Sequence, residues 1–387
     1  MKLFVITSRI PYPLEKGDKL RIFHQMKELS KNHQIYLCAL HSSNKKDDQL
    51  AYEVLNKFCE EVHFIKLAPI QIVLSLFKSL FTGMPFQTAL FTDVKAKQKV
   101  SALINSISPN HIYCQLTRAA EYVRSENRTK TLDYMDAFSK GMERRAKNTN
   151  LFTRWIYSWE ASKQKKYEKA IFSNFDSHCI ITKEDQSYID TPHKKEIKII
   201  RNGVDFNYFV PQKTSVKYDL VFVGNMGYAP NIDAAQFLCN DILPLIKKKI
   251  PAINILLAGA EPSLTVQNLK SEYVEVSGWL KDIRTAYSES NIFIAPMRIG
   301  TGLQNKLLEA MAMNKACITT PLANKALKAP TNSISIGFTA QELADECILL
   351  LNNKEQNNRQ ALLGNNFVKD AYQWSKTTDE LTKLFLL

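Results

Sequence analysis

The sequence predicts an α/β protein made of two domains, each built on a parallel sheet. The chain has 387 residues, and domains usually contain roughly 100–200 residues. Short continuous apolar runs, typical of buried parallel strands, alternate with amphipathic helical stretches. This alternation occurs in two successive series of similar length, the second beginning at Tyr218. Two such series predict two Rossmann-like domains.

The first series opens with a strand, a helix and a second strand. LFVIT (3–7) is an apolar run, and a loop containing Pro11, Pro13 and Gly17 follows it. Residues 18–33 then predict a helix, and IYLCAL (35–40) predicts the next strand. This βαβ order places the segment in the α/β class. Further strands are expected at residues 111–115, 131–135, 177–182 and 197–203.

The second series is the more regular of the two. Strands are expected at residues 219–224, 254–259, 274–278, 292–296 and 316–320, and helices at residues 231–249, 282–290 and 303–313. Pro211, Gln212 and Lys213 are typical of a linker, so we expect the domains to meet near residues 202–217. We expect the first domain to span residues 1–200 and the second to span residues 201–365.

Charge is distributed unevenly along the chain. The formal net charge is +13. Residues 1–200 hold 32 Lys and Arg against 21 Asp and Glu, whereas residues 201–387 hold 19 against 17. Such a basic half could face nucleic acid, an anionic membrane surface or an acidic substrate, or could simply be a solvated basic surface.

The cysteines and the apolar runs limit the possible compartments. The seven cysteines are widely spread and form no CxxC pair, which indicates reduced thiols in a cytoplasmic protein without a zinc knuckle or disulfide framework. The first ten residues contain too short an apolar run for a signal peptide. The longest apolar stretch, Ile70 to Phe81, is too short to span a bilayer.

Two segments interrupt the first series, and each has two interpretations. Residues 66–91 are rich in Leu, Ile and Phe, and residues 151–172 carry Trp155, Tyr157 and Trp159, followed by a basic run. Apolar and aromatic residues beside lysines are typical of a helix that lies on an anionic membrane surface. Alternatively, both helices pack on the sheet with their aromatics inward. The basic run consists of Lys163, Lys165, Lys166 and Lys169.

Residues 292–313 form the most informative motif. A strand ends at Pro296, and a loop with Gly300 and Gly302 leads into a helix. The free N–H groups and dipole of a helix N-terminus attract anions, and Arg298 and Lys306 would add positive charge.

Glu309 follows Lys306 by three residues, so both side chains lie on one helix face. A cation beside a phosphate and a carboxylate one turn deeper would suit a nucleoside diphosphate, with the carboxylate accepting from the ribose hydroxyls. The alternative is a helix-surface salt bridge.

At this point the sequence resembles a known family. Three segments resemble the retaining GT-B glycosyltransferases of family 4. They are RNGVDFNYFVP (201–211), DLVFVGNMGYAPNIDAAQFL (219–238) and residues 274–320, which contain APMRIGTGLQNKLLEAMA. SRIPYPLEKGDKLRIFHQMKELS (8–30) is similar to a subgroup of sugar transferases associated with exopolysaccharide biosynthesis. The resemblance extends over nearly the whole chain.

The resemblance implies two facing Rossmann-like domains with the active site in the cleft between them. The N-terminal domain would bind the acceptor, the C-terminal domain would bind the nucleotide sugar, and a final helix, residues 366–387, would cross back to the first domain. The resemblance and the motif of residues 292–313 together give three sets of candidate residues. The catalytic set is Arg298, Lys306 and Glu309; the nucleotide-sugar set is Asn202, Gly203, Gly224, Asn225, Gly300, Thr301, Gly302, Leu303 and Gln304; the acceptor or donor-sugar set is Gly17, Arg118 and Asp136.

The sequence departs from the family pattern at two places. Thr301 stands where many members have a Glu, although the suspected subgroup also lacks that acid. Residues 225–231 stand where many members place Arg and Lys, so Arg298 and Lys306 would have to supply the positive charge instead.

The expected activity is transfer of a sugar from a nucleotide diphosphate sugar to a glycan or lipid-linked acceptor, with retention at the anomeric carbon. No metal is expected, because no Asp-x-Asp motif occurs. No cofactor is expected besides the donor substrate. The resemblance implies a reaction on one face of the sugar without a clear protein nucleophile, so none is named. The protein would be cytoplasmic, with a peripheral position on the inner face of the membrane as an open alternative.

There are three alternative functions. A dehydrogenase would need a GxGxxG fingerprint after the first strand, which is absent. A nucleic-acid-binding protein would need a recognisable binding motif, which is also absent, so no nucleic-acid partner is expected. A non-catalytic membrane-associated scaffold with the GT-B fold is the remaining alternative, and Thr301 is its main support.

Overall fold

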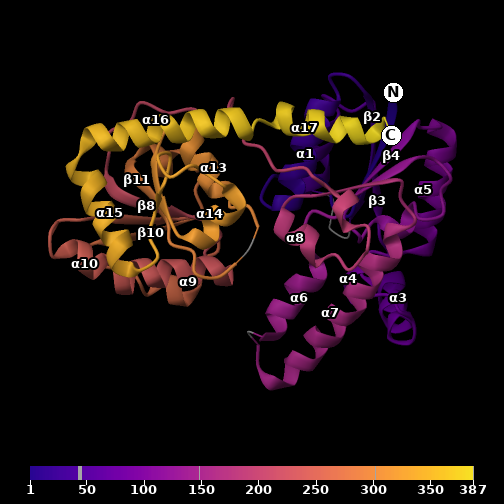
Figure 1. The fold of residues 1–387 in the computed structure, drawn as a ribbon. Helices are drawn as coiled ribbons and strands as arrows, with labels where there is room; N and C mark the ends of the chain where they lie inside the picture. Colours follow the sequence, from indigo (N-terminus) through magenta and orange to yellow (C-terminus); the bar gives the residue numbers. More distant parts are fainter. Residues whose placement is uncertain (42–45, 148, 301, 387) are drawn as a thin grey trace. The chain divides into compact units, whose positions relative to one another are not determined.

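The computed structural model describes residues 1–41, 46–147, 149–300 and 302–386. The chain divides into two compact units (Figure 1). The first unit contains Met1–Arg201 together with Trp374–Leu387, and the second contains Asn202–Gln373.

The first unit is built on a seven-stranded parallel sheet of order β3-β2-β1-β4-β5-β6-β7. The central strand β1 is buried from Leu3 to Thr7, because parallel strands covered on both faces require apolar side chains in both directions. The strands are β1 (Lys2–Thr7), β2 (Gln34–His41), β3 (Glu61–Lys66), β4 (His111–Gln115), β5 (Lys130–Asp133), β6 (Ser177–Ile180) and β7 (Lys198–Ile199).

Helices connect the strands of the first sheet, and the chain terminus returns to this unit. Trp374 stacks on His24 of α1 with ring centroids 5.1 Å apart, and Phe385 packs against His111 and Tyr113. The α-helices are α1 (Gly17–Leu29), α2 (Lys46–Leu55), α3 (Pro69–Phe81), α4 (Phe86–Ala89), α5 (Val94–Ile107), α6 (Phe138–Lys147), α7 (Leu151–Phe172), α8 (Lys183–Tyr188) and α17 (Trp374–Thr382). Short 3-10 turns are η1 (Ala120–Tyr122), η2 (Lys194–Glu196) and η4 (Lys383–Phe385).

The second unit is built on a six-stranded parallel sheet of order β10-β9-β8-β11-β12-β13. Its core is continuous through the buried faces of β8, β9, β11 and β12. The strands are β8 (Tyr218–Val223), β9 (Ile255–Ala258), β10 (Val274–Gly278), β11 (Ser290–Ala295), β12 (Ala316–Thr319) and β13 (Ser335–Ile336).

The helices of the second unit end with α16, which packs on the body of this unit. Asn365 of α16 donates to the carbonyl oxygens of Met311 and Ala312 at 3.0 and 2.9 Å. The helices are α9 (Ala229–Phe237), a π-helical turn η3 (Leu238–Ile242), α10 (Leu243–Lys247), α11 (Leu264–Gln267), α12 (Arg284–Ser288), α13 (Asn305–Ala312), α14 (Pro321–Leu327), α15 (Ala340–Asn352) and α16 (Lys354–Ala371).

The α/β class with two parallel-sheet domains is confirmed. The units meet in sequence at Arg201–Asn202, and residues 366–373, which the sequence assigns to the returning helix, lie within the second unit. The break falls there because α16 ends at Ala371 and α17 begins at Trp374. Strand β3 was not expected, because an edge strand carrying Glu61, His63 and Lys66 has no continuous apolar run.

The seven cysteines are all free, and six of them are buried. Among the described residues, no helix is both long and apolar enough to cross a bilayer.

Candidate active site

The second sheet has a topological switch point between β8 and β11. From β8 the chain moves outward through β9 and β10, and from β11 it moves the other way through β12 and β13. The segments that follow β8 and β11 therefore diverge at the carboxyl ends of these strands, which is where ligands bind in doubly wound sheets. Residues 224–231 and 296–306, which include most of the second-unit candidates, follow these two strands.

Lys306, in the first turn of α13, is one of two candidate cations in these segments. Its Nζ donates to Oδ1 of Asn231 at 2.5 Å and lies 4.6 Å from the ring centroid of Phe222. Burial lowers the pKa of Lys306 to about 7, although the carboxylate of Glu309 opposes the shift. The partner that Nζ contacts is a neutral amide, so this ammonium can still take an anionic partner.

Two glycines allow the backbone to approach Lys306 closely. A Cβ on Gly224 would lie 2.7 Å from Nδ2 of Asn231 and 3.1 Å from Nζ of Lys306. Gly259 has φ +138°, and a Cβ there would lie 1.9 Å from the carbonyl oxygen of Gly224. Any side chain at either position would displace the lysine or the end of β8.

Glu309 lies one turn after Lys306. The hydroxyl of Tyr287 donates to its Oε2 at 2.8 Å, and Tyr287 is fully buried. Burial raises the pKa of Glu309, whereas the hydrogen bond from Tyr287 and the charge of Lys306 oppose the shift. Tyr287 thus holds one carboxylate oxygen and leaves Oε1 for another donor.

Arg298 is already paired. Its guanidinium donates through Nη2 and Nε to the carboxylate of Asp233 at 2.7 and 3.2 Å, and lies 4.3 Å from the ring centroid of Phe237. The side chain remains 46% exposed. Both partners belong to α9, so this helix contacts Arg298 as well as Lys306.

The glycine loop before α13 lies against the first turn of α9. A Cβ on Gly300 would lie 3.4 Å from Cβ of Pro230, and Gly300 and Gly302 have φ values of +105° and +81°. These backbone conformations favour glycine. Thr301 lies outside the described residues.

The remaining nucleotide-sugar candidates include residues near the start of α13. Asn202 is buried, and its Nδ2 donates to Oδ1 of Asn305 at 3.3 Å, while Gly203 beside it is also buried. Leu303 packs against the core, and Gln304 precedes α13 without a side-chain cap hydrogen bond.

Asn225 shapes the turn after β8. Its Oδ1 accepts from the backbone N–H of Gly227 and its Nδ2 donates to Glu261, both at 2.8 Å. Both ends of its side-chain amide are thus used within the protein.

The first sheet has its own switch point, between β1 and β4. Gly17 begins α1 in an open position, since a Cβ there would meet nothing within 4 Å. Packing therefore does not require glycine at this position. Arg118 follows β4, donates to Oε1 of Gln87 at 2.6 Å and lies over the rings of Phe91 and Phe138. Burial and the neighbouring Arg9 lower the pKa of Arg118 to about 10.

Asp136 follows β5 and is electrostatically coupled to Arg118. Its side chain reaches solvent, but the protein packed around it limits its hydration and, with the carboxylates of Asp185 and Glu168, raises the pKa of Asp136 to about 7.

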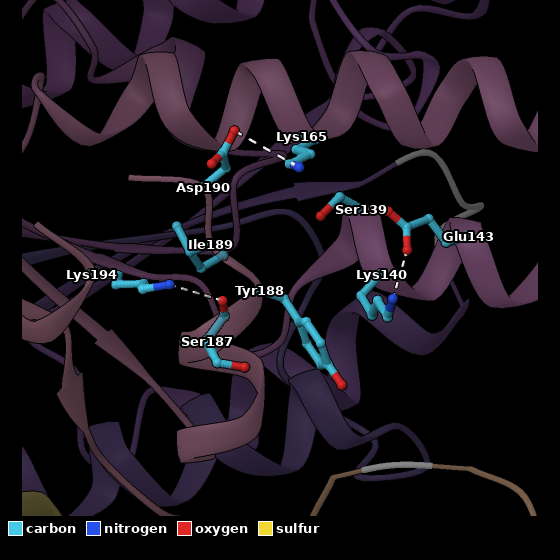
Figure 2. A pocket seen from close by; sticks show the side chains of 9 residues that line it. All are labelled: Ser139, Lys140, Glu143, Lys165, Ser187, Tyr188, Ile189, Asp190 and Lys194. Atoms are coloured by element: carbon cyan, nitrogen blue, oxygen red, sulfur yellow. Dashed lines mark hydrogen bonds and ion pairs between the residues drawn. The ribbon is translucent and has the colours of Figure 1, made fainter. Parts of the chain in front are cut away.

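A separate cavity of about 210 Å³ lies in the first unit, among α6, α7 and the segment around α8 (Figure 2). Its charged groups largely satisfy one another. Lys140 pairs with Glu143 at 2.7 Å, Lys165 lies 3.9 Å from Asp190, and Lys194 donates to the carbonyl oxygen of Ser187. No candidate residue lines it.

Sequence reasoning missed Asn231, Asp233 and Tyr287, which hold Lys306, Arg298 and Glu309. The segment that contains Asn231 carried one signal, since it stands where the family places cations. Tyr287 is 22 residues from Glu309 and Asn231 is 75 residues from Lys306, so no local spacing could reveal either contact. Within the described part of the chain, no group of three or more His, Cys, Asp or Glu side chains could hold a metal ion.

Two curated proteins are similar in sequence to this chain. A chain from Klebsiella pneumoniae described as an uncharacterized 44.6 kDa protein in the cps region is 22% identical over 355 residues, covering 84% of each chain. An uncharacterized glycosyltransferase of Methanocaldococcus jannaschii, MJ1069, is 25% identical over 238 residues, which is 56% of this chain and 60% of that protein.

Solved structures match the whole fold. Sucrose-phosphate synthase from Thermosynechococcus elongatus superposes with a TM-score of 0.69 at 14% identity, covering 100% of this chain and 98% of that one. Anabaena HepE in complex with UDP and glucose gives a TM-score of 0.69 at 13% identity, covering 99% and 98%. The chain therefore has the GT-B fold. Residues 217–353, which lie within the second unit, match the family model described as glycosyl transferases group 1.

Proposed function

We propose that this protein transfers a sugar from a nucleotide diphosphate sugar to a glycan or lipid-linked acceptor, with retention at the anomeric carbon. The observation that carries the proposal is Lys306, a partly buried ammonium at the N-terminus of α13 whose hydrogen-bond partner is neutral. The group 1 domain supports the reaction class. The relative from the cps region supports a role in exopolysaccharide or cell-surface glycan biosynthesis.

The donor would bind at the switch point of the second sheet. Its diphosphate would meet the N–H groups at the start of α13 and the ammonium of Lys306. Arg298, held on α9 by Asp233, would add positive charge. The ribose hydroxyls would donate to Oε1 of Glu309, the oxygen that Tyr287 does not hold.

In the reaction, the bond between the anomeric carbon and the diphosphate oxygen breaks, and its electron pair leaves with the diphosphate. The acceptor hydroxyl oxygen forms the new bond on the same face of the sugar, and its proton passes to the departing diphosphate or to solvent. Stabilisation of the developing diphosphate charge would be the main contribution of the protein. Gly17, Arg118 and Asp136 remain the candidates on the acceptor side, and no protein nucleophile is proposed.

The direct test is a panel of UDP- and GDP-sugars followed by thermal shift and by product analysis. A bound nucleotide raises unfolding stability by about 2.7 kcal/mol at a hundredfold excess over Kd. Binding together with sugar release or transfer supports the proposal. Binding without any turnover over the whole panel would favour a non-catalytic scaffold, and absence of binding would contradict the donor site.

Glu309→Gln tests the ribose contact. We expect nucleotide affinity to fall by about 1.5–3 kcal/mol, because the charged acceptor of the ribose hydroxyls is lost. Tyr287→Phe should cost less, about 0.5–1.5 kcal/mol, since it only frees the carboxylate to rotate. Calorimetric titration with the nucleoside diphosphate measures both. Unchanged affinity in a folded Glu309→Gln variant would remove Glu309 from the site.

Activity should survive EDTA. The charges proposed to meet the leaving diphosphate are Lys306, Arg298 and the helix N-terminus, all of which belong to the protein. Turnover is measured before and after chelation, and again after Mg²⁺ or Mn²⁺ is returned. Complete loss with EDTA and recovery with metal would contradict a metal-independent reaction.

A further inference from the structure

Helix α3 presents an apolar face to solvent. Six large apolar side chains on this 13-residue helix are each at least 50% exposed: Ile70, Val73, Leu74, Phe77, Leu80 and Phe81. Single exposed apolar residues are common, but a contiguous set of this size on one helix marks a surface that is covered by something else.

The other side of α3 is fixed by polar contacts, so the helix cannot roll its apolar face inward. Ser75 donates to the carbonyl oxygen of Thr92 at 2.7 Å, and Ile72 packs on the core of the unit. Lys163 of α7 donates to the carbonyl oxygens of Ser79 and Thr82, which fixes the C-terminal end. The outward orientation of the six side chains is therefore built into the fold.

Lys163 consequently has a different role from the one that the sequence suggested. Its ammonium holds the end of α3 and lies 3.9 Å from the ring centroid of Trp159. Lys165, Lys166 and Lys169 remain exposed on α7. The basic run of α7 thus supplies one anchor for α3 and three solvent-facing charges.

The solvent-facing charges in the segment that contains α3 are all positive. Residues 66–99 contain five lysines, Lys66, Lys78, Lys95, Lys97 and Lys99, and a single acid, Asp93. Asp93 is buried and accepts from the backbone N–H groups of Ala68, Lys95 and Ala96, so its charge is used to fix the start of α3 beside α5. No solvent-facing carboxylate lies within residues 66–99 of the described chain.

We propose that α3 is a membrane-docking helix, which lies in the plane of a bilayer and inserts its six exposed apolar side chains beneath anionic headgroups. An exposed apolar helix face, in a segment whose solvent-facing charges are all lysines, has the chemistry of an interfacial helix. The inference rests on the proposed function only for the reason why the protein would dock: a lipid-linked acceptor would be presented at the membrane surface. Vesicle binding itself needs neither donor nor turnover.

The test is flotation of the full chain with vesicles of phosphatidylcholine alone or of a two-to-one mixture with phosphatidylglycerol. We expect binding to the anionic vesicles that weakens as salt rises, because salt screens the lysine attraction. Phe77→Ser combined with Phe81→Ser should lower the partition coefficient by about tenfold or more, since two bulky apolar side chains no longer leave water.

The matched control is Phe338→Ser combined with Leu264→Ser, which removes two side chains of comparable exposure from the second unit and should leave partitioning unchanged. An added indole provides a second readout. The fluorescence of Phe77→Trp should be quenched by brominated lipid, whereas that of Phe338→Trp should not.

Three results would overturn the proposal. The wild type fails to float with anionic vesicles at low salt; the Phe77 and Phe81 variant binds as well as the wild type; or the variant converts a dimer to a monomer while vesicle binding is absent, which would make a second copy the partner. Nucleotide-induced thermal shift is recorded on every variant. A retained shift with lost flotation separates failure of docking from failure of the proposed donor site.

Discussion

Lys306→Met should abolish most of the catalysis while leaving the second unit folded. The substitution keeps the length and apolar contact of the side chain over Phe222 but removes the charge. Loss of one group aimed at the developing charge of a leaving group typically lowers kcat about 10²–10³-fold. Nucleoside diphosphate affinity should fall by about 1.5–3 kcal/mol. Removing a charge from a partly buried position should also leave the melting temperature of the free protein unchanged or higher.

The titration of Lys306 gives this prediction a second readout. Because its pKa is lowered to about 7, the side chain is only partly charged in the free protein at neutral pH. A bound diphosphate favours the ammonium, so binding should take up about half a proton at pH 7, and more at pH 8. Affinity should therefore weaken as pH rises from 6 to 8.

Calorimetry in buffers of different ionisation enthalpy measures the proton uptake. Glu309, the other titratable group beside Lys306 with a shifted pKa, acts in the opposite direction. Ribose hydroxyls favour the carboxylate form of Glu309, so any protonated fraction of this carboxyl would release a proton when the nucleotide binds. Uptake that disappears in Lys306→Met assigns the proton to the lysine, and Lys248→Met, an exposed lysine on the same unit, is the control. Equal uptake in both variants would contradict the assignment.

The parts of the fold that sequence predicted are those governed by local pattern. Parallel strands buried on both faces read as apolar runs, so β1, β2, β4, β8, β9, β11 and β12 were placed correctly to within a few residues. Helix α7 was expected over residues 151–172 and spans these residues. Residues 66–91 were treated as one helical segment, but the chain leaves the helix at Thr82 and Pro85 precedes α4.

In the candidate site, too, the sequence predicted what is local. Lys306 and Glu309 are three residues apart, so their position on one helix face follows directly from the sequence. What surrounds them is not local: α9 supplies Asn231 and Asp233, and α12 supplies Tyr287. The sequence identified Lys306, Glu309 and Arg298 as candidates, but it could not show that Arg298 is already paired with Asp233 or that Lys306 donates to the neutral amide of Asn231.

The first unit contains a buried ion pair whose disruption should have the largest effect on stability. Nε of Arg21 lies 2.6 Å from Oδ2 of Asp133, and both side chains are 0% exposed. The carboxylate also accepts from the Tyr113 hydroxyl at 2.8 Å and from the backbone N–H of Met135 at 3.0 Å. The pair joins α1 to the end of β5, the strand that leads to Asp136.

Asp133→Asn or Arg21→Met alone should destabilise the first unit by about 3–5 kcal/mol, because each leaves one charge buried without its partner. Arg21→Met combined with Asp133→Leu should recover much of the loss, since no buried charge remains. Urea unfolding followed by tryptophan fluorescence measures this unit, as Trp155, Trp159 and Trp374 lie in it and only Trp279 lies in the other.

Lys383→Gln provides the comparison, because it removes an exposed ion pair with Glu380 from the same unit. Exposed pairs contribute about 0–1 kcal/mol, so its unfolding midpoint should stay close to that of the wild type. A double variant no more stable than Asp133→Asn would show that the shape of the site, and not the uncompensated charge, determines the cost. The pair would then be required for packing α1 against β5 whatever its charge.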